Sequence, residues 1–163
     1  MKNIFSIVVL AVFGAILSGC SQSKAVPQEG IFVVWKSPVM KYADQGFLYH
    51  EKGRLRLEIY ASGQPALKLT VTPAQVCSGA LCMSAKEFNR RYLSADYPAD
   101  TLQKILEGRP IFSGEGRSET QAGFTQKIEK KGHYAIDYSV LNGSIVFRDT
   151  INRIVIKIQK ESA

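Results

Sequence analysis

Residues 54–71 read RLRLEIYASGQPALKLTV and carry the clearest structural pattern in the chain. Leucine or isoleucine stands at positions 55, 57 and 59, with charged residues between them. After SGQP at 62–65, which is typical of a turn, Leu67, Leu69 and Val71 continue the alternation. Apolar residues at every second position indicate antiparallel strands with one face in the core and the other in water. The segment therefore predicts a β-hairpin.

Strand patterns flank this hairpin on both sides. Before it, the segments 31–36 (IFVVWK) and 47–51 (FLYHE) are rich in apolar and β-branched residues. Near the other end of the chain, Asn142-Gly143 is the strongest short signal for a hairpin turn. The C-terminal third predicts strands at 124–128, 134–140, 145–147 and 153–158.

Two short helices are predicted between the two groups of strands. Ser84 and Glu87 have the spacing of a capping box, which predicts a helix over 85–92. A second helix should begin near Pro98 and end at Gly108, because proline favours a first helical turn and glycine a helix end. The apolar face of this second helix consists of Leu102, Ile105 and Leu106.

The composition is that of one globular domain. The chain has 163 residues, of which 45% are hydrophobic and 21% charged, and this excludes a repeat array, a collagen-like chain and a multi-span membrane protein. Paired strands with two short helices between them predict a β-rich α+β fold. A sheet with one apolar face needs a cover. Two short helices would cover it incompletely, and an apolar cavity left there is a way to hold a lipid.

The first 30 residues predict export and lipid anchoring. Residues 1–19 form a signal peptide, with one lysine, a short apolar run and then small residues. The ending Leu17-Ser18-Gly19-Cys20 resembles the bacterial lipobox, which implies diacylation of Cys20 and cleavage before it. The alternative is an ordinary secretory signal with a chance cysteine. Ser21, where retained lipoproteins have aspartate, implies the outer membrane, and 20–30 would be a lipidated tether.

The two remaining cysteines, Cys77 and Cys82, are five positions apart and predict a disulfide across a tight hairpin in an exported protein. A redox pair is less well supported because the usual redox motif has two intervening residues. A metal site would need more ligands, and the chain has only two histidines. No nucleophile elbow, phosphate-binding loop or dinucleotide motif occurs. We therefore expect no enzyme activity, no metal and no cofactor.

The chain is basic, with a formal net charge of +7. Loss of residues 1–19 removes one lysine and leaves +6. Outside the cytoplasm, positive charge favours solubility and attracts anionic membrane surfaces or acidic partners. We expect no nucleic-acid partner in that compartment, and we expect a monomer.

Residues 98–110, PADTLQKILEGRP, resemble the family of LolB, the outer-membrane receptor for lipoproteins. The matching residues are Pro98, Leu102, Gly108 and Pro110, and the order of strands, helices and four closing strands over 31–160 fits as well. The resemblance implies an incomplete antiparallel β-barrel covered by short helices, with an apolar cavity. It also implies that the protein accepts lipoproteins from a LolA-like periplasmic carrier and inserts them into the outer membrane, without cofactor or covalent step.

Several apolar side chains are candidates for lining the acyl-chain cavity, with core packing as the alternative for each. They are Trp35, Leu57, Ile59, Leu69, Leu102, Ile105, Leu106 and Tyr138.

LolB-like proteins also have an exposed leucine in the turn between their third and fourth strands, which is thought to enter the membrane. Here that turn contains Ser62 and Gly63 and has no leucine at its apex. Leu81, at the tip of the cysteine hairpin, is the other candidate, although a leucine there could equally pack against the protein. The competing function is a lipid-anchored structural or protein-interaction domain of the same fold that transfers no lipid.

Overall fold

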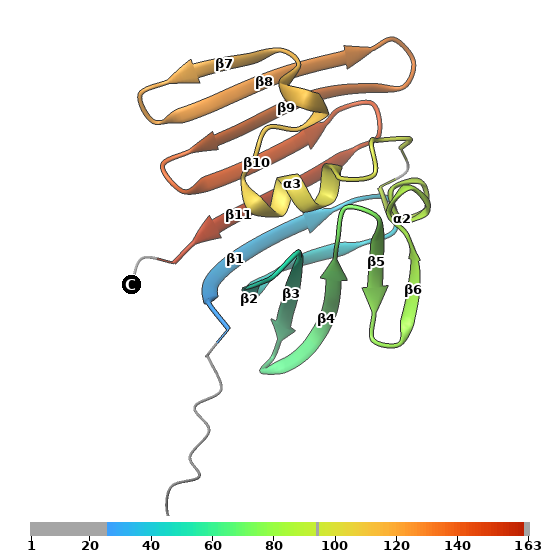
Figure 1. Cartoon of the computed structure of the whole chain (residues 1–163), viewed down its shortest axis with the longest axis vertical. Coiled ribbons are helices and arrows are strands. Elements are labelled where there is room, and N and C mark those ends of the chain that lie inside the picture. Colours follow the sequence, from blue (N-terminus) through green and yellow to red (C-terminus); the bar gives the residue numbers. More distant parts are fainter. Residues whose placement is uncertain (1–25, 94, 162–163) are drawn as a thin grey trace, which may run out of the picture.

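The computed structural model describes residues 26–93 and 95–161. These residues form one sheet of eleven antiparallel strands in the order β6-β5-β4-β3-β2-β1-β11-β10-β9-β8-β7 (Figure 1). Because β6 and β7 are the two edges, the sheet is not closed. Two short helices lie between the two groups of strands in the sequence. This confirms the predicted β-rich α+β class.

The N-terminal strands are β1 (Gln28–Lys36), β2 (Lys41–Glu51), β3 (Arg54–Ala61), β4 (Gln64–Val71), β5 (Gln75–Ser78) and β6 (Leu81–Ser84). The helices that follow are α2 (Ala85–Tyr92), α3 (Thr101–Glu107) and the 3₁₀ turn η1 (Phe112–Gly114). The C-terminal strands are β7 (Arg117–Thr120), β8 (Gly123–Lys130), β9 (Tyr134–Leu141), β10 (Ser144–Asp149) and β11 (Ile154–Lys160).

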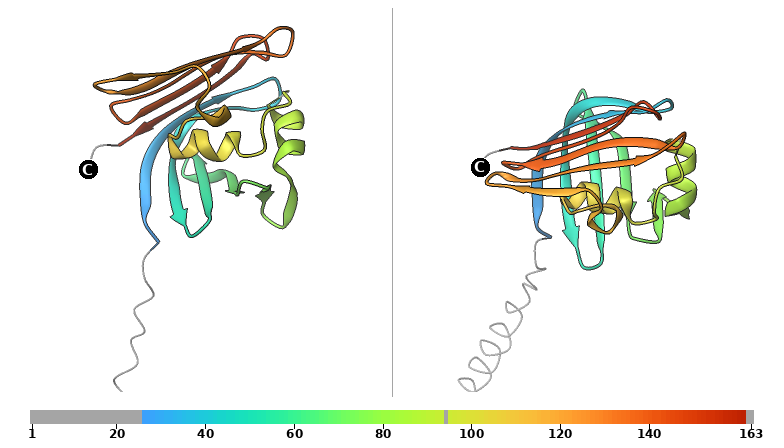
Figure 2. Two further views of the ribbon diagram at one scale, coloured as in Figure 1. Left: turned by 45° about the horizontal axis from the view of Figure 1, so that its top comes forward. Right: turned by 90° about the horizontal axis from the view of Figure 1, so that it is seen from above.

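The first and last strands join the two halves of the sheet. β1 pairs with β11 from Ile31 opposite Lys160 to Lys36 opposite Val155, and on its other side β1 pairs with β2. The sheet bends so that α3 lies between its two halves (Figure 2). The inner face of the bend therefore receives apolar side chains from both halves and from α3.

The apolar face of α3 packs into this interior. Leu102, Ile105 and Leu106 are each no more than 1% exposed. Full burial of such a side chain contributes roughly 1.5–3 kcal/mol. They share the core with inward-facing residues of the strands, which include Trp35, Leu57, Ile59, Phe147 and Ile156.

Both predicted helices are present. The sequence predicted the bounds of α2 more accurately than the start of α3. α2 begins and ends as predicted, and the Ser84 hydroxyl accepts a hydrogen bond from the Glu87 amide at 3.1 Å. α3 begins at Thr101 rather than near Pro98, and its N-cap Asp100 makes no side-chain capping hydrogen bond. It ends as predicted at Gly108, whose φ of 67° is left-handed and favours glycine.

Three strands also differ from the sequence prediction. β2 starts at Lys41, six residues before the predicted segment 47–51. β1 starts at Gln28, so the last three residues of the predicted tether pair with Phe47, Leu48 and Tyr49 of β2. β7 was not predicted, because all four of its residues are exposed and polar and no apolar alternation marks it. The predicted signal peptide and Cys20 lie outside the described residues.

Candidate functional site

An apolar pocket of about 210 Å³ lies where β4, β5 and β6 meet α2. Most of its wall is made of aliphatic, aromatic and methionine side chains. Its lining consists of Met40, Leu67, Leu69, Val76, Ser78, Leu81, Met83, Phe88 and Tyr92.

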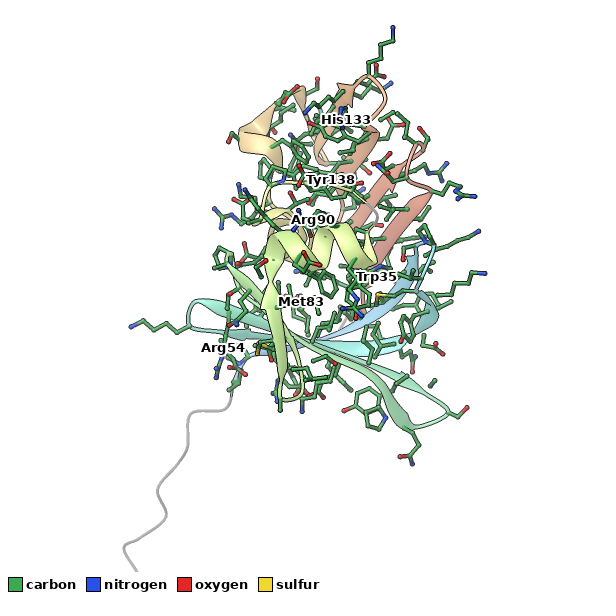
Figure 3. The ribbon with its side chains drawn as sticks, turned by 90° about the vertical axis from the view of Figure 1, so that its right-hand side faces the viewer. Trp35, Arg54, Met83, Arg90, His133 and Tyr138 are labelled. Atoms are coloured by element: carbon green, nitrogen blue, oxygen red, sulfur yellow. A yellow bond between two sulfur atoms is a disulfide. The ribbon has the colours of Figure 1, made fainter. Side chains whose placement is uncertain are left out.

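Helix α2 supplies the aromatic wall of this pocket. Phe88 and Tyr92 are four positions apart, which places them on the same face of the helix. Their ring centroids are 4.8 Å apart. The Phe88 and Trp35 rings pack edge to face, with their centroids 6.5 Å apart, and Figure 3 shows Trp35 and Met83 on the side of the sheet that α2 covers. The pocket is therefore in contact with the core through Phe88.

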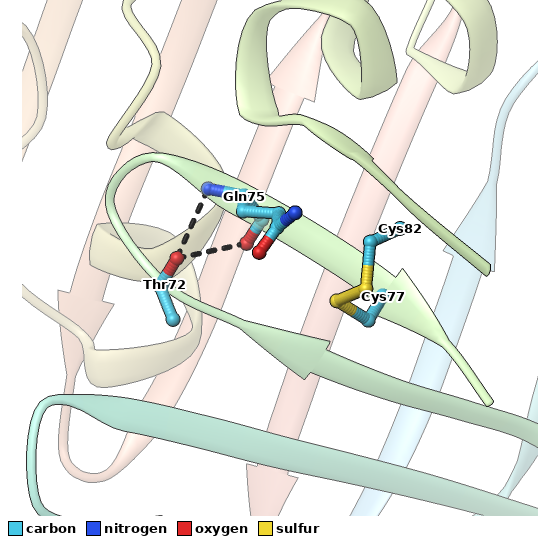
Figure 4. Close-up of a disulfide and its surroundings, with 4 residues drawn as sticks. All are labelled: Thr72, Gln75, Cys77 and Cys82. Carbon is cyan, nitrogen blue, oxygen red and sulfur yellow. Dashed lines mark hydrogen bonds between the residues drawn. A yellow bond between two sulfur atoms is a disulfide. The ribbon is translucent and has the colours of Figure 1, made fainter. Parts of the chain in front are cut away.

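The hairpin of β5 and β6 supplies the opposite wall, and the disulfide Cys77–Cys82 holds it (Figure 4). The two cysteines are directly opposite each other, with Cα atoms 4.0 Å apart. Because side chains alternate along a strand, the neighbouring pair Val76 and Met83 faces the other way and lines the pocket. The predicted disulfide is thus present, and it fixes the register that aims Val76 and Met83.

Leu81 is both a lining residue and the most exposed large apolar side chain among the described residues, at 77% exposure. Of the two alternatives left open by the sequence, the exposed leucine is the one observed. Ser62 and Gly63 form the exposed two-residue turn between β3 and β4, with φ angles of 52° and 77°. They do not line the pocket. Insertion of either turn into a membrane stays a prediction.

The residues predicted to line a cavity lie in three environments. Leu69 lines the pocket. Tyr138 is buried, donates a hydrogen bond to the Arg109 carbonyl at 3.1 Å, and borders a shallow hollow over β8, β9 and β10. Burial raises the pKa of Tyr138. The other six pack in the core, each at most 1% exposed: Trp35, Leu57, Ile59, Leu102, Ile105 and Leu106.

Core packing, the alternative given for each of these residues, is thus the environment observed for those six. The pocket residues that the sequence did not single out as lining are Met40, Leu67, Val76, Ser78, Met83, Phe88 and Tyr92. Part of this lining could have been predicted from the aromatic pair at positions 88 and 92 of the predicted helix. Val76 and Met83, the apolar residues that flank the two cysteines, offered a second such pattern.

A polar network anchors the turn between β10 and β11. The Asp149 carboxylate is fully buried and accepts hydrogen bonds from the amides of Ile151 at 3.0 Å and Asn152 at 3.2 Å. The Tyr97 hydroxyl also donates to Asp149. Burial and this hydrogen bond raise the pKa of Tyr97. Every one of these contacts holds the turn in place, and a catalytic role is not needed to explain the buried carboxylate.

Residues 26–93 and 95–161 contain no group of three or more histidine, cysteine, aspartate or glutamate side chains placed to hold a metal ion. In the same ranges, no helix has the length and apolar character needed to cross a membrane.

Comparison with models of known protein families finds none that matches this sequence, and comparison with curated proteins finds no match either.

Proposed function

We propose that this chain is a LolB-like outer-membrane lipoprotein, anchored through Cys20 on the periplasmic side, that accepts lipoproteins from a LolA-like carrier. The apolar pocket beside α2 takes up an acyl chain during the transfer. The observation that carries this proposal is the combination of an apolar pocket with the exposed Leu81 at its rim. The antiparallel sheet bent around α3 supports the incomplete barrel that the resemblance implies.

The size and lining of the pocket suit part of an acyl chain. Its volume of about 210 Å³ lies below the range of about 300–1,000 Å³ that is typical of pockets for drug-sized ligands. Met40 and Met83 contribute flexible thioether side chains, which adapt to ligands of irregular shape. Each buried methylene contributes about 0.8 kcal/mol. A few methylenes therefore give a moderate affinity, which suits a receptor that must release its cargo.

Transfer needs no chemical step under this proposal. An acyl chain moves from the carrier to the pocket and then to the bilayer if each site buries it at least as well as the one before. Leu81 is placed to contact the chain while it is still partly in water. The many methylenes buried in a bilayer make the last site the most stable one.

The test is a titration of palmitate into the chain from Ser21 to Ala163, followed through Trp35, the only tryptophan in the sequence. Trp35 contacts the pocket wall through Phe88, so its emission should change on binding. The variant Ser78→Phe places a large ring in the pocket and should abolish this change. The matched control Ser118→Phe alters an exposed serine on the edge strand β7 and should bind as the parent does.

One observation favours the competing function. The six predicted cavity residues in the core, on α3 and on the sheet, are each at most 1% exposed, as expected of a packed interaction domain. If palmitate produces no response in the parent chain, the interaction domain is the better description. An equal response in the parent chain and in Ser78→Phe would place the acyl chain outside this pocket.

A further inference from the structure

A second cleft, of about 730 Å³, lies at the end of the sheet where β1 turns into β2 and β10 turns into β11. Its lining contains four exposed basic side chains, Lys36, Lys41, Arg148 and Arg153. Within residues 26–93 and 95–161, none of the four makes a salt bridge. The one acidic residue in the lining is Asp149, whose buried carboxylate is occupied by the turn that follows it.

The strand register places three of these charges in one row. Lys41 is opposite Lys36, Lys36 is opposite Val155, and Val155 is opposite Arg148. Directly opposed residues share a face, and Lys36, Lys41 and Arg148 are exposed, so this row lies on the outer surface. Two lysines directly opposite each other reduce the stability of a sheet. The lysine pair therefore does not stabilise the fold. An anionic surface bound to both lysines would offset their mutual repulsion.

Each of the two turns that flank the cleft presents an exposed apolar side chain. Val39, between β1 and β2, is 59% exposed, and Ile151, between β10 and β11, is 47% exposed. Both turns are ordered by hydrogen bonds to a buried side chain. The Met40 amide donates to the Ser37 hydroxyl at 3.1 Å, and the Ile151 amide donates to Asp149. The two apolar side chains are thus held in water at the rim of a basic cleft.

The row of charges suits an extended anionic surface better than one small anion. Neighbouring strands are about 4.8 Å apart, so a row over β2, β1, β11 and β10 spans about 14 Å. That distance is greater than the width of one lipid headgroup. Apolar side chains beside lysine and arginine are also the combination that binds the interface of anionic bilayers, where the apolar groups enter the headgroup region.

We propose that the turns 37–40 and 150–153, with the four basic residues between them, form a docking edge for the phosphate headgroups of an anionic bilayer. The docking edge does not depend on the acyl-chain pocket, although Met40 of the first turn belongs to both. The two are adjacent in the chain, since Met40 lines the pocket and its neighbours Val39 and Lys41 belong to the docking edge. A docked molecule would thereby hold the pocket close to the bilayer.

The test is sedimentation of the chain from Ser21 to Ala163, which keeps every described residue, with vesicles. Vesicles of phosphatidylcholine with phosphatidylglycerol should bind it, and vesicles of phosphatidylcholine alone should not. Binding should be lost between about 0.1 M and 1 M salt, as the Debye length falls from about 10 Å to 3 Å. The double variant Lys41→Gln with Arg153→Gln should bind about 30-fold more weakly, and Val39→Ser with Ile151→Ser about tenfold more weakly.

The matched control is Lys52→Gln, compared with Lys41→Gln. Lys52 is exposed in the turn that follows β2, at the other end of the eleven-residue strand that Lys41 begins. Lys41→Gln should lower binding about fivefold and Lys52→Gln should leave it unchanged. Equal losses would show attraction by net charge alone and would overturn the proposal. Equal binding to both kinds of vesicle would also overturn it. So would thermal stabilisation by inorganic phosphate without vesicle binding, which would indicate a site for a free anion.

Discussion

Phe88 and Tyr92 lie one turn apart on α2 and both line the apolar pocket, yet only Phe88 is also a core residue. Phe88 is 3% exposed and contacts Trp35, whereas Tyr92 is partly buried and packs against the core from outside. The same helix face therefore serves two purposes, with stability at one position and the pocket wall at the other.

Alanine substitutions should separate these two purposes. Phe88→Ala should lower the free energy of unfolding by about 3–5 kcal/mol, because it leaves a cavity in the core. Tyr92→Ala should cost about 1 kcal/mol and should weaken palmitate binding, because it removes an aromatic wall of the pocket. Denaturant unfolding and palmitate titration of both variants are the measurements. The assignment fails if Tyr92→Ala is as unstable as Phe88→Ala or binds palmitate like the parent.

The disulfide should contribute to stability without determining the fold. Cys77 and Cys82 close a short loop, for which the chain-entropy model gives about 2 kcal/mol. The double variant Cys77→Ser with Cys82→Ser should unfold at lower denaturant concentration with an unchanged circular dichroism spectrum. Because the hairpin register aims Val76 and Met83, palmitate affinity should also fall. Two free thiols in denatured protein from the periplasm would contradict the disulfide.

A charge on the buried face of α3 should unfold the domain. Leu102 is 1% exposed, so the carboxylate of Leu102→Glu would have to be desolvated inside the core, at a cost of several kcal/mol. The control is Lys86→Glu on α2, since Lys86 is exposed and the position should tolerate the charge. Thermal unfolding compares the two. A folded Leu102→Glu domain that had lost palmitate binding would instead place a cavity beneath α3.

Structural features that depend on residues close together in the sequence were the ones predicted best. The start of α2 follows from Ser84 and Glu87, which are three residues apart and contact each other directly. The disulfide follows from two cysteines that oppose each other in one hairpin. The start of α3 was less well predicted because Asp100 provides no side-chain cap.

Features that depend on distant pairing were not predictable in the same way. β7 is a strand because Arg117 and its neighbours pair with β8, and its own side chains are all exposed. The pocket brings Met40 from the turn before β2 against β6 and α2, which requires the curvature of the whole sheet. The alternation of Leu57 and Ile59 identifies an inner face, but it does not say whether that face borders a cavity or a packed helix.

The ion pairs around Glu58 should make stability depend on pH. Glu58 is largely buried on β3, directly opposite Lys68, whose ammonium lies 2.9 Å from its carboxylate. Burial opposes ionisation, but hydrogen bonds from Lys68 and Tyr60 outweigh it and hold the pKa of Glu58 below its usual value. A carboxyl whose pKa is lowered by folding stabilises the folded state above its unfolded pKa of about 4.3, and this contribution is lost as the pH falls through the folded pKa.

The variant Glu58→Gln should therefore be about 1 kcal/mol less stable than the parent at pH 7. The difference should shrink as the pH is lowered below about 4, where the parent carboxyl also becomes neutral. Denaturant unfolding at a series of pH values measures it. A difference that stays constant across this range would show that the variant acts through packing and not through charge.

Acylation of Cys20 is the prediction on which the anchoring rests. Cys77 and Cys82 are joined in a disulfide, so Cys20 is the one cysteine of the chain's three left to carry a lipid. In bacterial cells fed labelled palmitate, the parent chain should incorporate label and Cys20→Ala should not. The double variant Cys77→Ser with Cys82→Ser is the matched control and should incorporate as much label as the parent. Label retained by Cys20→Ala would exclude the lipobox, and the receptor proposal would then lack the anchor that holds it at the outer membrane.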